Sequence, residues 1–374
     1  IGGISVTGLY ATAGCSDPLL YAFEAHGCSL ETYARSPHHV SLEIWGISKL
    51  VTMRDRLSSI EAVVPRDGGT MGYLGHEGLY VFEQERAKAY RERGLALEYF
   101  KSWDSRWHDS SLLFNSMFEV DTAYLQPCSE LTLNDAVEME NYFHHTGDEG
   151  GVVRNDEGKV AAARCWHDYW WIAPACRANV SKCVISLTAS PGWGLLDNIQ
   201  RAALFNMPMA FAVASNTTAW GQSGRAFRGA HYWYVPDDTF VDLLPSQIFF
   251  PPYKAEEWAV GLRATQNAMT TLSKVVWNRL GALDPRVERF ISNLDFGGTI
   301  LDRLLVDATT NDTDSHETVA CRWILSNQHV WSRWIPSPTE CNVGLGLVNA
   351  SRSFVDSLAT SGGMMAMGGA VGCD

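Results

Sequence analysis

The sequence predicts an α/β protein with two lobes, and three observations support this prediction. The N-terminal part alternates strand-like and helix-like segments, which indicates a mainly parallel sheet with crossover helices. The chain has 374 residues, more than the roughly 150 of a typical domain, so two lobes are expected. From Ala255 onward the sequence becomes strongly helical.

The expected elements begin with two strands around one helix. Ile4 to Tyr10 (ISVTGLY) and His39 to Trp45 (HVSLEIW) have the β-branched and aromatic residues typical of strands, and Pro18 to His26 is helix-like. Gly68 to Gly78 (GGTMGYLGHEG) is rich in glycine, so we expect a loop or a crossing between lobes there. A second loop is expected at His144 to Gly151.

Two amphipathic helices are expected near the C-terminus. The first begins with Asp284 as N-cap and Pro285 in its first turn. Its apolar residues recur at helical spacing, namely Val287, Phe290, Ile291 and Leu294. The second helix ends at Pro336, and we assign its tryptophans, Trp323, Trp331 and Trp334, to packing.

The charge and composition exclude several classes of protein. There are 29 Lys and Arg against 42 Asp and Glu, a formal net charge of −13. Phosphate recognition needs a cationic surface, so no nucleic-acid partner is expected. With 46% hydrophobic and 19% charged residues, the chain can bury a large core. No apolar run approaches the roughly 20 residues that span a bilayer, so direct membrane insertion is not expected.

The cysteines and glycosylation sequons predict a secreted or cell-surface eukaryotic protein. The nine cysteines contain no CxxC pair, and they could form disulfides in an oxidising compartment. Because the number is odd, at least one thiol would stay unpaired within the chain, and we place it at Cys373. The start at Ile1 without Met is consistent with signal-peptide removal or a trimmed chain. Four N-x-S/T sequons are candidate glycosylation sites: Asn179, Asn216, Asn311 and Asn349.

Cofactor and metal sites have little support in the sequence. Gly72, Gly75 and Gly78 follow neither the dinucleotide nor the P-loop pattern, so no nucleotide cofactor is expected. His144 and His145 precede acidic residues and have donors suited to a metal, but adjacent histidines in a polar loop are more typical of a solvated surface.

A hydrolase remains an alternative, because Cys165 and His167 resemble parts of a Cys/His catalytic pair. It requires both groups in one cleft at hydrogen-bond reach. We expect Cys165 to lie in a disulfide instead.

The aromatic residues point to ligand binding. There are 14 Trp, 13 Tyr and 15 Phe. Trp45 closes a predicted strand directly after Glu43 and Ile44, where an α/β sheet usually ends in its ligand crevice. Other aromatics lie in turn-like or strand-end contexts: Trp193, Trp220, Tyr232, Trp233 and Tyr234. Indole faces attract soft cations, so several around one cavity would form a cage for a quaternary ammonium group.

Four segments also resemble one known family. His39 to Trp45 is similar to its strand that ends in a ligand-stacking Trp. The stretch Ala255 to Phe296, which contains DPRVERFISNLDF, resembles its P-x-V-x-x-x-L-x-x-L-x-F helix. Ala320 to Ile335 (ACRWILSNQHVWSRWI) resembles its A-x-x-W-L-x-x-N-x-x-x-x-x-W-L helix. Ala189 to Ala214 is similar in its turn, helix and strand. Over Ile4 to Pro336 the chain thus resembles the substrate-binding proteins of glycine betaine, proline betaine and choline ABC transporters.

The resemblance implies a type II periplasmic-binding-protein fold, with two lobes, a hinge and a ligand in the cleft between them. Lobe 1 would comprise residues 1–80 and 247–345 and lobe 2 residues 81–246, followed by a C-terminal tail at 346–374. Such proteins bind solutes without chemistry, so an enzyme is not expected.

The resemblance also implies an aromatic box around the ligand. Trp45 matches one box position, and Tyr10 and Tyr80 are candidates for others. Where the family often has a Trp after a second-lobe strand, this sequence has Ala214-Ser215-Asn216. The remaining candidates are Glu43, to neutralise the cation, and Trp193 and Trp233, to close from the opposite lobe.

Two functions follow as hypotheses. The first is an extracellular module that captures a small cationic or zwitterionic solute and serves a membrane receptor or transporter. The second is a glycosylated structural subunit of an extracellular filament or surface assembly, which reuses the fold without a ligand and has other subunits as partners.

Overall fold

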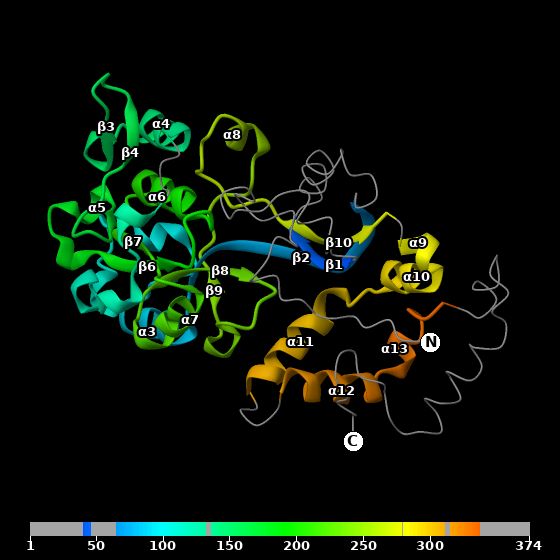
Figure 1. The fold of residues 1–374 in the computed structure, drawn as a ribbon. Coiled ribbons are helices and arrows are strands. Elements are labelled where there is room, and N and C mark those ends of the chain that lie inside the picture. Colours follow the sequence, from blue (N-terminus) through cyan, green and yellow to red (C-terminus); the bar gives the residue numbers. More distant parts are fainter. Residues whose placement is uncertain (1–39, 46–64, 132–135, 279, 311–314, 337–374) are drawn as a thin grey trace, which may run out of the picture. The chain divides into compact units, whose positions relative to one another are not determined.

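The chain is divided into two compact units. The computed structural model describes residues 40–45, 65–131, 136–278, 280–310 and 315–336. Unit 1 contains the described residues up to Gly75 and from Thr270, and unit 2 contains His76–Met269. The chain enters unit 2 within strand β2 (Pro65–Val81) and leaves it between Met269 and Thr270 (Figure 1).

Some expectations lie outside these residues or stay predictions. The expected strand at Ile4 to Tyr10, the expected helix at Pro18 to His26 and the C-terminal tail lie outside the described residues. The hinge and the lobe boundaries remain predictions. Within the part of the chain that the structure describes, no helix has the length and apolar character needed to cross a membrane.

Unit 1 contains three antiparallel strands in the order β1-β10-β2. Strand β1 (Val40–Trp45) confirms the strand expected at this position. It pairs with β10 (Thr270–Trp277), which pairs in turn with the first half of β2. The helices of this unit are α9 (Leu280–Leu283), α10 (Pro285–Asn293), α11 (Gly297–Thr310), α12 (His316–Ser326) and α13 (Gln328–Trp331).

The core of unit 1 lies between its strands and the aromatic side chains of its C-terminal helices. As predicted, α10 begins at Pro285 with Asp284 as its N-cap, whose carboxylate accepts from the backbone N of Arg286 and Val287. The core cluster contains Met71, Tyr73, Leu272, Leu294 and Trp334, with Trp323 and Trp331 packed against it. The assignment of these tryptophans to packing is therefore confirmed.

The single terminal helix expected from the sequence is interrupted. It forms two helices, α12 and α13, because Asn327 has φ −124° and ψ 35° and leaves the helical conformation. The Asn327 side-chain Nδ2 donates to the backbone O of Trp323 (2.8 Å), which satisfies a carbonyl at the end of α12.

Unit 2 is built on a mixed sheet in the order β2-β8-β6-β7-β5. Strand β6 (Val184–Thr188) runs parallel to both β7 (Met209–Val213) and β8 (Ala230–Val235). The second half of β2 pairs antiparallel with β8 and with β9 (Ser246–Gln247), and β5 (Trp171–Ile172) antiparallel with β7. A separate hairpin joins β3 (Val152–Arg154) and β4 (Val160–Ala163).

The expectation of a mainly parallel sheet is wrong for the described strands. Only the β6–β7 and β6–β8 pairs are parallel among the pairings of the described chain. Antiparallel partners do not need a crossover helix, so the strand and helix order along the sequence did not reveal them.

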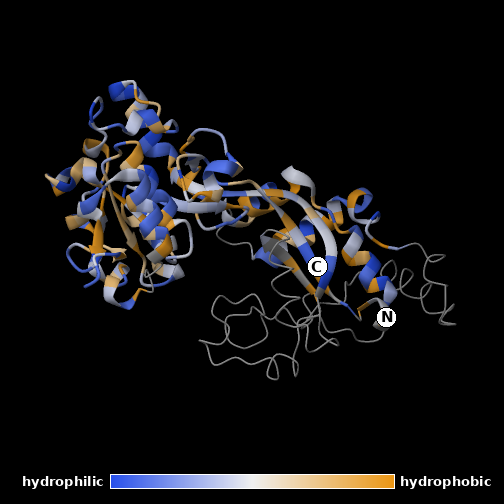
Figure 2. Ribbon diagram, turned by 90° about the horizontal axis from the view of Figure 1, so that it is seen from above, coloured by the Kyte–Doolittle hydropathy of each residue, from blue (hydrophilic) through white to orange (hydrophobic). Residues whose placement is uncertain are grey.

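Helices cover both faces of the unit 2 sheet. Helix α6 (Leu195–Leu204) connects β6 to β7, and α7 (Thr217–Ala226) connects β7 back to β8 on the other side of β6. Right-handed crossovers in opposite directions place α6 and α7 on opposite faces (Figure 1). In Figure 2, hydrophobic residues run along the central strands of this unit. The other helices are α3 (Glu83–Arg93), α4 (Ala136–Thr146), α5 (Pro174–Arg177) and α8 (Ala255–Ala259).

The glycine-rich segment Gly68 to Gly78 is not a loop but lies inside β2. The other expectation, a crossing, is consistent with the division of the chain, which passes from unit 1 to unit 2 between Gly75 and His76. These glycines do not form a turn. They allow other parts of the chain to pack closely against the strand and allow positive φ angles. At Gly72 φ is 74°, and a Cβ there would overlap the carboxylate of Asp295. The register between β2 and β10 shifts twice beside these glycines, which is typical of bulges.

Two further expectations were wrong. Residues 270–277 form strand β10 within the region expected to be helical, consistent with the β-branched Thr270, Thr271, Val275 and Val276. His144 and His145 lie in the last turn of α4 rather than in a loop. Their favourable position near a helix C-terminus was missed.

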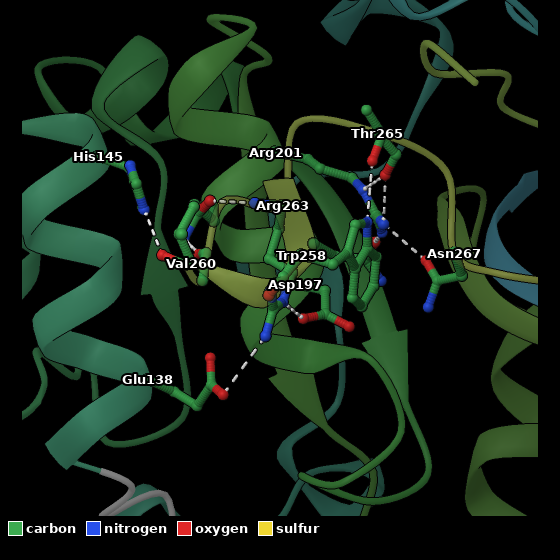
Figure 3. A network of polar contacts seen from close by, with 12 residues as sticks. Glu138, His145, Asp197, Arg201, Trp258, Val260, Arg263, Thr265 and Asn267 are labelled. Atoms are coloured by element: carbon green, nitrogen blue, oxygen red, sulfur yellow. Dashed lines mark hydrogen bonds and ion pairs between the residues drawn. The ribbon is translucent and has the colours of Figure 1, made fainter. Parts of the chain in front are cut away.

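A buried arginine fixes the segment before the chain leaves unit 2 (Figure 3). Arg201 on α6 is 1% exposed. Its guanidinium donates twice to the backbone O of Thr265 (3.0 and 2.7 Å), once to Asn198 Oδ1 (2.9 Å) and once to Asn267 Oδ1 (2.6 Å). Burial lowers the pKa of Arg201 to about 10, so it remains charged at neutral pH.

A second arginine holds the same segment. Arg263 donates from Nε to Asp197 (2.9 Å), and its guanidinium lies 4.5 Å from the ring centre of Trp258. Arg201 lies 5.7 Å from the same ring, and Trp258 Nε1 donates to Thr265 Oγ1 (2.8 Å). Residues 258–267 are thereby bonded to α6 (Figure 3).

Candidate functional site

Three parallel strands of unit 2 end at the same edge of the sheet. Strands β6, β7 and β8 run in one direction, so the segments that follow Thr188, Val213 and Val235 lie together. In α/β sheets, ligands bind at the carboxyl ends of such strands. This edge is therefore where a site is expected within unit 2.

The segment after β6 positions Trp193. Thr188 Oγ1 donates to the backbone O of Ser190 (3.2 Å) and of Trp193 (3.0 Å), which holds the turn closed. Gly194 then takes the left-handed conformation (φ 62°) and caps α6. A Cβ on Gly194 would lie 2.8 Å from Cε2 of Tyr232, so this position requires glycine for space as well as for conformation.

Three aromatic rings meet at this edge, and we call Trp193, Trp220 and Tyr234 the aromatic site. Trp193 approaches Trp220 (5.7 Å between ring centres, 80° between planes) and Tyr234 (5.3 Å, 83°) nearly at right angles. Trp220 and Tyr234 are almost parallel (6.2 Å, 5°). They come from the turn after β6, from α7 and from the end of β8.

The aromatic site lines a depression of about 470 Å³. The rest of its wall is polar and comprises Thr217, Thr218, Gly221, Arg225, Asp238 and Thr239. Arg225 is bonded to Asp242 Oδ1 (2.7 Å) and to Thr239 O (3.1 Å), so its charge is already paired. Trp193 and Tyr234 are partly exposed beside Asp238 and form a surface that favours a cation, whereas Trp220 is 2% exposed and packs against both rings.

Two sequence-predicted residues, Tyr80 and Trp233, lie in the core beneath this edge. They are 2% and 3% exposed and pack edge to face (5.3 Å). The Tyr80 hydroxyl bonds with His76 Nδ1 (2.7 Å), and Trp233 Nε1 donates to Asp237 Oδ1 (3.1 Å). Side chains alternate along β8, so Trp233 points to the opposite face from Tyr232 and Tyr234.

Of the sequence-predicted candidates, Trp193 alone lines the depression. Trp45 belongs to unit 1, is partly buried and packs against the core cluster that contains Tyr73 and Trp334. Glu43 lies in β1, and its side chain is outside the described residues, as is all of Tyr10. The structure also brings Trp220 and Tyr234 to the depression, which the sequence analysis named among the aromatic residues without choosing them as ligand-binding candidates, and it adds Asp238.

A buried polar pair lies next to the aromatic site. The Tyr232 hydroxyl donates to Glu77, whose other carboxylate oxygen accepts from Asn267 Nδ2 (2.8 Å). Burial, and then the Glu77 carboxylate, raise the pKa of Tyr232, so the phenol stays neutral. This bond fixes the β8 face from which Tyr234 projects.

The hydrolase alternative is removed. Cys165 is bonded to Cys128 (S–S 2.08 Å) and has no thiol to act as a nucleophile. The expectation that Cys165 lies in a disulfide is thus confirmed. Cys176 and Cys183 form a second disulfide, and Cys321 is also disulfide-bonded. Cys373 lies outside the described residues.

No metal site is found among the described residues, where no three His, Cys, Asp or Glu side chains are grouped to hold an ion. His145 Nε2 bonds with the backbone O of Val260 (2.9 Å). Asp148 accepts from Arg177 (2.7 Å) and from the Tyr142 hydroxyl (2.5 Å). His145 and Asp148, which the sequence offered as possible metal ligands, therefore form hydrogen bonds within the protein.

Two of the four sequons are described, and both asparagines are exposed. Asn179 Oδ1 accepts from the hydroxyl of Ser181, the third sequon residue (2.7 Å). Asn216 is the N-cap of α7, and its Oδ1 accepts from Ala219 N (2.8 Å). Asn311 and Asn349 lie outside the described residues.

The sequence matches no protein-family model and no curated protein. Among solved structures, it is similar to lactococcal OpuAC complexed with glycine betaine, with a TM-score of 0.39 and 10% identity over 85% of this chain and 92% of that one. An ABC-transporter choline-binding protein in complex with choline has a TM-score of 0.40 and 12% identity over 86% and 85%. The glycine betaine/L-proline-binding protein ProX from Borrelia burgdorferi has a TM-score of 0.39 and 9% sequence identity, over 86% of this chain and 92% of that one. These three solved structures are binding proteins for glycine betaine, L-proline or choline.

Proposed function

We propose that the chain is an extracellular solute-binding module that holds a small quaternary ammonium or zwitterionic ligand at the aromatic site. The observation that carries this proposal is the meeting of Trp193, Trp220 and Tyr234 on one depression beside Asp238. It lies at the carboxyl ends of three parallel strands, where α/β sheets bind ligands. The net charge of −13 favours the approach of a cation.

The expected contributions match a weak to moderate binder. A cation on an exposed aromatic ring gains about 0.5–1 kcal/mol, so the two partly exposed rings, Trp193 and Tyr234, supply about 1–2 kcal/mol before any contribution from Asp238. In a zwitterion, the anionic end would lie toward Thr217 and Thr218, because the positive N-terminal end of α7 favours a carboxylate.

The other sequence-predicted residues keep separate roles in this proposal. Tyr80 and Trp233 act through packing, since both are buried and Trp233 contacts Phe240, which in turn contacts Trp220. The stacking of a ligand on Trp45, with Glu43 and Tyr10, stays a prediction.

Calorimetric titration and thermal shift with choline, glycine betaine, proline betaine, carnitine and dimethylsulfoniopropionate test the proposal. A ligand at roughly 100 times its dissociation constant should stabilise the protein by about 2.7 kcal/mol. Trp193→Ala should weaken binding about two- to fivefold, because it removes one ring at about 0.5–1 kcal/mol.

Trp107→Ala is the matched control, since Trp107 is a 76% exposed tryptophan of unit 2 that does not line the depression. It should leave the affinity unchanged. Equal losses in the two variants, or no binding by any compound of the panel, would contradict the proposal.

We also propose that the chain is secreted and N-glycosylated at Asn179 and Asn216. Both side chains are exposed within complete N-x-S/T sequons, and the two disulfides of unit 2 are typical of an oxidising compartment. Mass spectrometry of peptides from protein secreted by eukaryotic cells should find both asparagines occupied. Unmodified asparagine at both positions would refute this part.

A further inference from the structure

We infer that an N-linked glycan at Asn216 controls access to the aromatic site. This inference rests on the proposed function and adds a means of regulation. Asn216 directly precedes Thr217 and Thr218, and both threonines line the depression. The residue that carries the glycan is therefore the direct neighbour of a wall residue, with about 3.8 Å between the Cα atoms of Asn216 and Thr217.

The side chain of Asn216 can carry a glycan without loss of the helix. Its Oδ1 accepts the cap bond from Ala219 N (2.8 Å), whereas the glycosidic bond forms at Nδ2. The cap bond thus remains in place and holds the carboxamide over the first turn of α7. The glycan leaves from the same helix end that forms part of the depression wall.

The backbone before Asn216 is also fixed. Ala214 N donates to Thr188 O (2.8 Å), and Ser215 N donates to Tyr124 O (2.8 Å). Ser215 Oγ adds a bond to Ala123 O (3.1 Å). The backbone bonds before Asn216 and the cap bond of its side chain to Ala219 N thus hold the attachment point of the glycan in place.

A bulky sugar at this position narrows the mouth of the depression. The rings Trp193 and Tyr234 are only partly exposed before any glycan is attached. A glycan that covers these rings further lowers the fraction of ligand encounters that reach them. The association rate should therefore fall more than the dissociation rate changes. Asn179 provides the contrast, because its sequon lies at residues 179–181, none of which lines the depression.

Three forms of the full chain, secreted from eukaryotic cells, test the inference: wild type, Asn216→Ser and Asn179→Ser. Asn216→Ser removes the sequon but keeps a neutral N-cap, so helix α7 should remain. Asn179→Ser removes a sequon that lies away from the depression. Glycan occupancy at each asparagine is measured by mass spectrometry, and association rates and Kd for choline and glycine betaine by surface plasmon resonance and calorimetry.

The inference predicts a glycan on Asn216 in the wild type and about tenfold faster association in Asn216→Ser. Asn179→Ser should bind as the wild type does. An unoccupied Asn216, or equal rates in wild type and Asn216→Ser, would overturn the inference and leave the proposed binding of a solute at the aromatic site standing. If Asn216→Ser binds none of the panel, the proposed function falls, and the inference with it.

Discussion

His231 makes the stability of unit 2 dependent on pH. Its side chain, on β8, packs against Phe82 (5.2 Å between ring centres, stacked) and Phe240 (5.7 Å) and is 0% exposed. Neither ring nitrogen has a hydrogen-bond partner of normal geometry among the described residues. Burial lowers the pKa of His231 to about 4, against a smaller opposing effect from the Phe227 backbone.

The sign and size of the effect follow from proton linkage. An unfolded histidine binds a proton below about pH 6.5, whereas the folded one does so only below about pH 4. Between these values the unfolded state binds more protons, so stability falls as the pH falls. The two pKa values differ by about 2.5, and at about 1.4 kcal/mol per pH unit this corresponds to about 3 kcal/mol.

The variant His231→Phe isolates this contribution. Phenylalanine has a similar shape, does not titrate and removes two unpartnered nitrogens, so stability at pH 7 should be equal or higher. Urea unfolding between pH 4.5 and 7.5, followed by tryptophan fluorescence, gives the free energy of unfolding of the wild type and of the variant. The advantage of the variant should grow by about 2 to 3 kcal/mol as the pH falls, because carboxylates titrate alike in both proteins. A constant difference across this range would refute the reasoning.

Two further predictions concern helices. Arg201→Met should lower the free energy of unfolding by about 2–4 kcal/mol, because it leaves the carbonyl of Thr265 and its other partners unpaired; urea unfolding measures this, and a loss below about 0.5 kcal/mol would show that the network is not stabilising. Asp284→Ala should cost about 1 kcal/mol through loss of the α10 cap, while Asp284→Asn should retain most of it. Thermal unfolding of the pair checks this, and equal losses would argue for a role of charge instead of capping.

Features that depend on a few neighbouring residues were predictable from the sequence. The cap at Asp284 and the strand that ends at Trp45 are examples, because their signals lie within one turn or one strand. The alternation along β8 could also have separated Trp233 from Tyr232 and Tyr234, since successive side chains point to opposite faces.

Features that depend on distant partners were not predictable. Gly72 was assigned to a loop or a crossing, but it lies in a strand. A glycine is needed there because the carboxylate of Asp295 occupies the space of a side chain. Cys165 was expected in a disulfide, yet sequence spacing did not identify Cys128 as its partner. In both cases the deciding contact is made by a residue far along the chain.

The sequence by itself determined the α/β class, the acidic charge, the capped C-terminal helices and the wealth of aromatic residues. Only the tertiary structure decided which aromatics meet. Trp193, Trp220 and Tyr234 come from three segments that become neighbours because β6, β7 and β8 are parallel and end at one edge. Pairing of strands is set by contacts between distant residues, and local patterns of hydrophobicity do not encode it.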